Sequence, residues 1–171
     1  GQLIQRNAEV PIDLVAVVKP GDRIDFVVEP GVADNANGDD VIFSADLFIK
    51  KPVGMPADTI TSNYVGWSPE GEQGRAGWSH GYVVAEDVDR TYDADAFQLF
   101  PRNDENPEES SWQAGSRAYR WNPLGVMSLA MNRRLFRPRN HDEQTLMPVR
   151  RWTSTIAGPH WIQWAATKAA D

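Results

Sequence analysis

The sequence predicts an all-β fold: an antiparallel, jelly-roll-like β-sandwich with long loops and at most one short helix. Several runs rich in β-branched residues are bounded by Gly- and Pro-containing turns, which is the pattern of strands. Some of these runs also alternate apolar and polar residues with a period of two. The 13 glycines and 12 prolines suit a sandwich with many turns.

Three strands are expected in the first third of the chain. Residues 12–18 are rich in β-branched side chains and end at residues 19–22, a Lys-Pro-Gly-Asp turn signal. Residues 23–29 follow directly, so the tight turn predicts that these two strands pair as a hairpin. A polar loop over residues 32–40 then leads into a third strand over residues 41–49.

The second expected strand also predicts which side chains are buried. Its apolar residues recur at every second position: Ile24, Phe26 and Val28. Because successive side chains of a strand point to opposite faces, we expect these three to face the core of an interior or nearly interior strand.

The middle of the chain is less regular. Residues 50–77 are dense in Pro, Gly, Ser and Thr and predict a long connection with at most one short strand, near residues 63–65. Residues 77–84 predict a strand whose Trp, His and Tyr side chains share one face. A short element is expected at residues 97–100.

The last third of the chain predicts the single helix and two further strands. Residues 124–136 carry apolar side chains at imperfect helical spacing and end in arginines, so they are the only helix candidate. Residues 149–154 and 160–165 are expected strands on either side of a turn at residues 157–159.

Composition excludes several classes of function. The chain has no cysteine, which excludes disulfides, thiolate zinc sites, iron–sulfur clusters and a cysteine nucleophile. Its formal net charge of -7 disfavours nucleic acid and anionic membranes as partners. No apolar run approaches the roughly 20 residues that span a bilayer, so no membrane insertion is expected. The first residues show no signal-peptide pattern, so we expect a mature or excised chain.

Three stretches of the chain are distinctive: residues 18–31 (VKPGDRIDFVVEPG), residues 149–158 (VRRWTSTIAG) and residues 77–82 (GWSHGY). Through them the chain resembles a jelly-roll-like, carbohydrate-binding-type module attached to large exported bacterial proteins, including cytochrome-c-associated ones. The resemblance implies a β-sandwich that binds polysaccharide and a secreted location, extracellular or periplasmic. It also implies neighbouring domains of a larger protein as partners, and it transfers no catalytic residues.

The order of these stretches departs from the family. In the module the counterparts of the second and third stretches precede that of the first, whereas here they follow it. The chain is therefore either circularly permuted or crosses a module boundary, with residues 1–50 resembling the end of the module and residues 77–171 its start. A permutation is mechanically possible because the termini of compact domains often lie close together. The length of 171 residues falls in the range of one domain, so we expect residues 1–171 to form a single β-sandwich domain.

Large aromatic residues are the first candidates for ligand binding. A tryptophan offers an apolar face to a sugar ring and a polar N–H at its edge. Trp112 and Trp121 have polar neighbours and flank a loop or an edge strand, which makes them the preferred platforms. Trp161, Trp78 and Tyr82 complete the aromatic candidates. For any single tryptophan, packing in the core is the alternative.

The spacing of two tryptophans makes a sharper prediction. Trp161 and Trp164 lie three positions apart in one expected strand. A strand places odd and even offsets on opposite faces. We therefore expect one of the two in the core and the other on the surface.

Arginines between residues 133 and 151 form the only basic concentration in this acidic chain. Arginine forks bind carboxylate and sulfate bidentately, so Arg134 and Arg137 are candidates for contacts to an anionic polysaccharide. The alternative is a solvated face on which the arginines pair with the many carboxylates of the chain.

A calcium site is a further hypothesis. Asp34, Asn37, Asp39 and Asp40 supply hard oxygen ligands on a Gly-containing loop, and Ca²⁺ binds several such oxygens. The loop lacks the closing Glu of a helix–loop–helix calcium site. A hydrogen-bonded turn is the alternative, since Asn, Asp and Gly dominate turns. A structural Ca²⁺ is the only cofactor that the sequence suggests.

No catalytic motif is present: there is no nucleophile elbow, no paired metal-ligating histidines and no phosphate-binding glycine loop. His141, next to Asp142 and Glu143, is the best acid–base candidate, although a surface histidine beside acids is commoner. The sequence thus predicts a non-catalytic polysaccharide-binding module. The alternatives are a structural or interaction module that positions neighbouring domains and, third, a glycoside-active enzyme, whose carboxylate pair leaves no spacing to detect.

Overall fold

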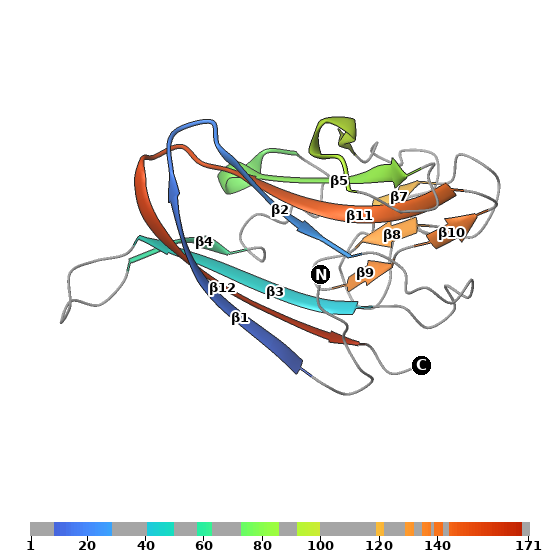
Figure 1. Ribbon diagram of the computed structural model, residues 1–171, viewed down its shortest axis with the longest axis horizontal. Helices are drawn as coiled ribbons and strands as arrows, with labels where there is room; N and C mark the ends of the chain where they lie inside the picture. The colour runs from blue at the N-terminus through green and yellow to red at the C-terminus, as the bar shows by residue number, and fades with distance from the viewer. Residues whose placement is uncertain are drawn as a thin grey trace.

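Two antiparallel sheets pack face to face in the computed structural model of the chain (Figure 1). The structure describes residues 9–28, 41–49, 58–62, 73–85, 92–99, 119–121, 129–131, 135–137, 139–141 and 144–168. Within these residues the predicted all-β sandwich is confirmed, and the helical elements are the short 3₁₀ turns η1 (Arg75–Gly77) and η2 (Ala94–Ala96). The described part of the chain holds no helix long and apolar enough to cross a bilayer.

Within the described residues the larger sheet is seven-stranded. Its strands run, in order, β1 (Glu9–Val18), β12 (Gly158–Lys168), β3 (Val41–Ile49), β9 (Leu135–Arg137), β8 (Leu129–Met131) and β7 (Tyr119–Trp121), and β4 (Asp58–Ser62) also pairs with β3. In the part of the chain that the structure describes, the smaller sheet is five-stranded. Its strands run β10 (Arg139–His141), β11 (Gln144–Thr153), β5 (Trp78–Ala85) and β6 (Gln98–Leu99), and β2 (Arg23–Val27) also pairs with β11.

Most of the expected strands are confirmed. The strands predicted over residues 12–18, 23–29, 41–49, 77–84, 149–154 and 160–165 correspond to β1, β2, β3, β5, β11 and β12. The short element near residues 97–100 is β6, and Trp121 ends a strand, β7, at the edge of the larger sheet. In the long connection β4 precedes the expected residues 63–65, which lie outside the described residues.

The helix expected over residues 124–136 is wrong. Strands β8 and β9 lie there and pair with each other, and β9 pairs with β3 through Val41 opposite Phe136. The apolar spacing of this stretch fits a helix only imperfectly, and intrinsic helix propensity is a weak determinant that tertiary context overrides. Pairing with β3 therefore decides the conformation.

The hairpin expected from residues 12–29 is also wrong, because β1 and β2 belong to different sheets. β1 pairs with β12 and β2 pairs with β11. The turn between them is a corner: the Gly21 N–H donates to the Ser154 carbonyl at 2.8 Å and the Ser154 N–H donates to the Asp22 carbonyl at 2.9 Å. Figure 1 shows this blue corner beside the orange-red corner between β11 and β12. A turn signal reports that the chain reverses, but not which strand it will pair with.

The three distinctive stretches of the sequence meet in the smaller sheet. β11 lies between β2 and β5, with Trp152 opposite Ile24 on one side and Trp78 on the other. The three distinctive stretches therefore contribute adjacent strands, whatever their order along the chain.

The core lies between the two sheets. Among the described residues, nine buried side chains from both sheets build it: Val18, Phe26, Ala45, Leu47, Trp78, Tyr82, Trp152, Ile162 and Ala166. Phe26 stacks on Trp78 with ring centroids 5.6 Å apart, and Ile24 and Val28 pack against the same cluster. The inward orientation predicted for Ile24, Phe26 and Val28 is confirmed. Trp78 also links the layers, because its indole N–H donates to the Thr61 hydroxyl at 3.0 Å.

Candidate ligand-binding face

The outer face of the smaller sheet is covered by residues 92–97, which lead into its edge strand β6. Beneath them lies a second buried cluster of Val83, Met147 and Val149, against which Val27, Tyr92, Ala96 and Phe97 pack. Phe97 lies directly over Gly81, where a Cβ atom would come within 2.6 Å of the ring. This face is therefore part of the interior of the domain.

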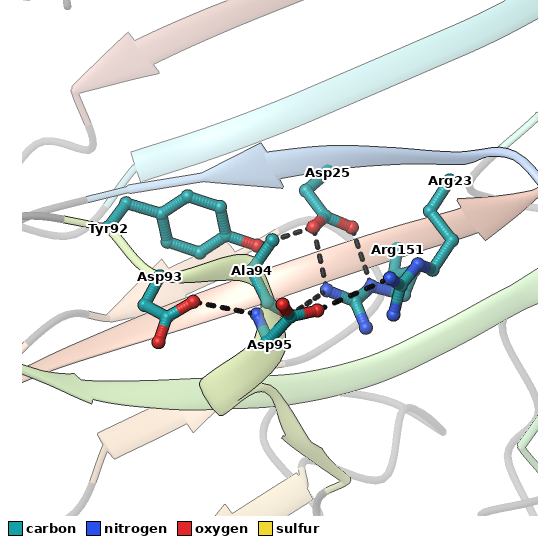
Figure 2. Close-up of polar contacts among 7 residues, drawn as sticks. All are labelled: Arg23, Asp25, Tyr92, Asp93, Ala94, Asp95 and Arg151. Carbon is teal, nitrogen blue, oxygen red and sulfur yellow. Dashed lines mark hydrogen bonds and ion pairs between the residues drawn. The ribbon is translucent and has the colours of Figure 1, made fainter.

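A polar network fastens the covering segment to the sheet (Figure 2). The Arg151 guanidinium donates from Nε and Nη2 to both carboxylate oxygens of Asp25, at 2.7 and 2.8 Å. Nη2 also donates to the Ala94 carbonyl at 2.7 Å, and the Tyr92 hydroxyl donates to Asp25 at 2.5 Å. The guanidinium carbon lies 4.0 Å from the centroid of the Phe97 ring. Two elements of the sheet, β2 and β11, thus hold the cover through one ion pair.

This network has the electrostatics of a structural support. The side chains of Arg151 and Asp25 are only 8% and 11% exposed, and the two form an ion pair with each other. The hydrogen bond from Arg151 to Asp25 raises the arginine's pKa. Burial, and then the hydrogen bond and negative charge of Asp25, raise the pKa of Tyr92 well above its ordinary value. The raised pKa values keep Arg151 and Tyr92 protonated at neutral pH, as a structural support requires.

The raised pKa of Tyr92 predicts a loss of stability at high pH. An unfolded tyrosine ionises near pH 10, whereas the folded Tyr92 stays protonated, so its contribution is present below about pH 10 and falls as pH rises further. We expect Tyr92→Phe to reduce the slope of unfolding free energy against pH between about pH 10 and 11. Urea titrations at both values measure it. An unchanged slope would contradict the shift.

The larger sheet presents a different outer face. Trp164 points inward. Its ring packs edge to face against the ring of Phe26, with the two ring centroids 6.2 Å apart. Trp161 points outward, partly exposed, with its ring centroid 5.8 Å from that of Phe48. The Trp161 indole N–H donates to a carboxylate oxygen of Asp13. The predicted separation of the two tryptophans onto opposite faces is confirmed.

Strand register arranges the side chains around Trp161 in two rows. Val15, Trp161 and Phe48 are directly opposite one another across β1, β12 and β3. Two residues along the same strands, Asp13, Gln163 and Asp46 form a second, polar row. We call Asp13, Val15, Val17, Asp46, Phe48, Trp161 and Gln163 the Trp161 face.

The Trp161 face combines apolar area with hydrogen-bonding groups. Val17 and Val15 are 81% and 49% exposed, so apolar surface is left in water at one end. At the other end Asp46 is partly buried, and this burial raises the pKa of its carboxyl group. Such a surface suits a partner that is itself half apolar and half hydrated.

The other ligand-binding and calcium-binding residues expected from the sequence lie in the core, in strands β7 and β9 or outside the described residues. Trp78 and Tyr82 are 0% and 4% exposed in the core, so the ligand-binding role expected for them is corrected: a buried ring has no open face for a sugar. Main chains of Trp121 and Arg137 lie in β7 and β9, and their side chains are outside the described part. The remaining candidates also lie outside the described residues: Trp112, Arg134, Asp34, Asn37, Asp39 and Asp40.

Part of the basic concentration is buried. Arg150 and Arg151 are 0% and 7% exposed, so the solvated face considered as an alternative does not describe these two arginines. His80 and His160 are buried as well, at 0% and 1% exposure. Within the described residues no three His, Cys, Asp or Glu side chains gather as a metal site would require.

Sequence analysis did not identify Asp13, Asp46, Phe48 and Gln163 as site residues. The alternation of residues 45–49 places Asp46 and Phe48 on one face, which is a usable signal. Their neighbourhood with Trp161 depends on the pairing of β12 with β3 and β1, which no local pattern reveals.

Comparisons with known proteins give no relative for this arrangement. No family model, curated protein or solved structure matches the chain.

Proposed function

We propose that this chain is a non-catalytic polysaccharide-binding module of an exported bacterial protein, and that the Trp161 face is its binding surface. The observation that carries the proposal is the pairing of an outward Trp161 and Phe48 with a row of carboxylates and an amide. A sugar ring has the matching character, with apolar C–H groups on its faces and hydroxyls around its edge.

The distance between the aromatic row and the polar row allows a sugar ring stacked on the first row to bring the hydroxyls of its edge to the second. Two residues along an antiparallel strand cover about 7 Å, so a ring stacked on Trp161 has its edge above Asp13, Gln163 and Asp46. The bond from the Trp161 N–H to Asp13 holds the indole in one orientation. A platform that is already ordered loses less conformational entropy when a ligand binds.

A second function rests on the exposed valines. Val17 and Val15, at 81% and 49% exposure, extend the apolar end of the face and suit a neighbouring domain of a larger protein. An interaction module of this kind would bury the same surface without recognising sugars. A glycan array separates the two functions, because only the first retains oligosaccharides on the isolated chain.

Trp161→Ala is expected to weaken glycan binding by about thirtyfold or more, because a central aromatic anchor typically contributes on the order of 2 kcal/mol. The melting temperature should change little, since Trp161 is partly exposed and its ring contacts lie on the outer face. Affinity electrophoresis in polysaccharide gels measures retention, and calorimetry the melting.

Trp164→Phe is the matched control, because Trp164 belongs to the same strand but packs against the core. It should lower the melting temperature and leave retention of the folded fraction intact. Full retention by the Trp161 variant would overturn the proposed binding surface.

A further inference from the structure

The charges of the Trp161 face have one sign. Asp13 and Asp46 lie on either side of Gln163 in the polar row. The outward positions Ser44, Pro159 and Ala165 are uncharged, and Lys19 follows Val17 at the apolar end of the face, six residues along the chain from Asp13. An anionic sugar placed over the polar row would meet the two carboxylates of Asp13 and Asp46.

Asp46 is the carboxylate best placed to take a charged partner. It is partly buried, and burial is what raises its pKa, with no described cation to offset the lost hydration. An incoming positive charge would supply the missing interaction, because opposite charges close together favour the ionised form of a carboxyl group. Asp13 differs, since one of its oxygens already accepts the Trp161 N–H.

The aromatic row favours the same kind of group. A cation positioned over the face of a tryptophan or phenylalanine is attracted by the negative face of the ring. Trp161 and Phe48 contact each other directly beside the polar row. A positive group bound between the rows would therefore contact both a ring and a carboxylate.

We propose that the Trp161 face selects polysaccharides whose sugars carry protonated amino groups over neutral and anionic polysaccharides. The selectivity rests on the proposed function, because it assumes that the face binds glycans at all. Trp161 and Phe48 supply stacking for any sugar, and Asp46 supplies the preference by accepting the ammonium group.

Calorimetric titration of the whole chain tests the selectivity with β-1,4-linked hexamers of glucosamine and of N-acetylglucosamine, and with an oligogalacturonate. The two hexamers share one backbone and differ in the charge of the amino group. We expect the glucosamine hexamer to bind about tenfold more tightly at low salt and pH 6, and the oligogalacturonate to bind weakest. High salt should reduce the preference, because ions screen exposed charges.

Asp46→Asn should weaken binding of the glucosamine hexamer about fivefold and leave binding of the N-acetylated hexamer unchanged. Its fold should hold, because burial makes ionisation of Asp46 unfavourable and the amide removes that charge. Asp95→Asn is the matched control. It removes the same charge from an exposed side chain on the covering segment of the other sheet.

Each outcome decides a different point. Equal affinity for the two hexamers overturns the selectivity and leaves the proposed function standing. Equal weakening by Asp46→Asn and Asp95→Asn also overturns it, because the attraction then belongs to the net charge of -7. No binding of any oligosaccharide overturns the proposed function together with the selectivity.

Discussion

Asp25→Ala should lower the free energy of unfolding by about 3–5 kcal/mol, because it leaves the buried Arg151 charge without its partner. The carboxylate accepts two bonds from Arg151 and one from Tyr92, so a single substitution frees three donors. Urea denaturation followed by tryptophan fluorescence measures the loss.

Two comparisons make this expectation specific to the buried pair. Asp95→Asn removes the partner of Arg23, but that pair is 3.5 Å apart with side chains 48% and 87% exposed, so about 1 kcal/mol or less should be lost. Replacing Asp25 by Leu together with Arg151 by Met should recover much of the stability, since neither charge is then left alone. A loss for Asp25→Ala no larger than that for Asp95→Asn would contradict a supporting role for the network.

Gly81→Ala should cost about 1–3 kcal/mol through overpacking. A Cβ atom at this position would lie 2.1 Å from the Gln98 carbonyl oxygen and 2.6 Å from the Phe97 ring. Residues 92–99 would have to move away from the sheet, exposing the cluster of Val83, Met147 and Val149. Urea denaturation measures the stability, and limited proteolysis measures the opening of residues 92–99.

A double substitution separates the contact with the Phe97 ring from the contact with the Gln98 carbonyl oxygen. Phe97→Ala removes the ring above Gly81, so Gly81→Ala should cost less in that background than in the wild type. Gly21→Ala provides the contrast, because its surroundings are open and only its φ of +90° opposes a side chain, at about 1 kcal/mol. Equal costs of Gly81→Ala with and without the Phe97 ring would show that the ring contact is not the cause and would leave the clash with the Gln98 carbonyl oxygen.

The local sequence pattern was sufficient to locate and orient the main strands of this protein. β-branched runs and turn signals located β1, β2, β3, β5, β11 and β12, and period two oriented Ile24, Phe26, Val28 and the two tryptophans of β12. These features depend on residues adjacent in the chain, and a strand's alternation follows from its own backbone geometry.

Only the tertiary structure decided which strands pair. Residues 19–22 signal a reversal equally for a hairpin and for a corner between sheets, and the pairing of β1 with β12 selects the corner. That pairing, together with the pairing of β12 with β3, brings Asp13 and Asp46, 33 positions apart in sequence, to either side of Gln163 and beside Trp161. Likewise Asp25 meets Arg151 across 126 positions. Such contacts form because segments far apart in the sequence bury their side chains against one another. A pattern within one strand can therefore show that Trp161 points outward, but it cannot identify which residues lie beside it.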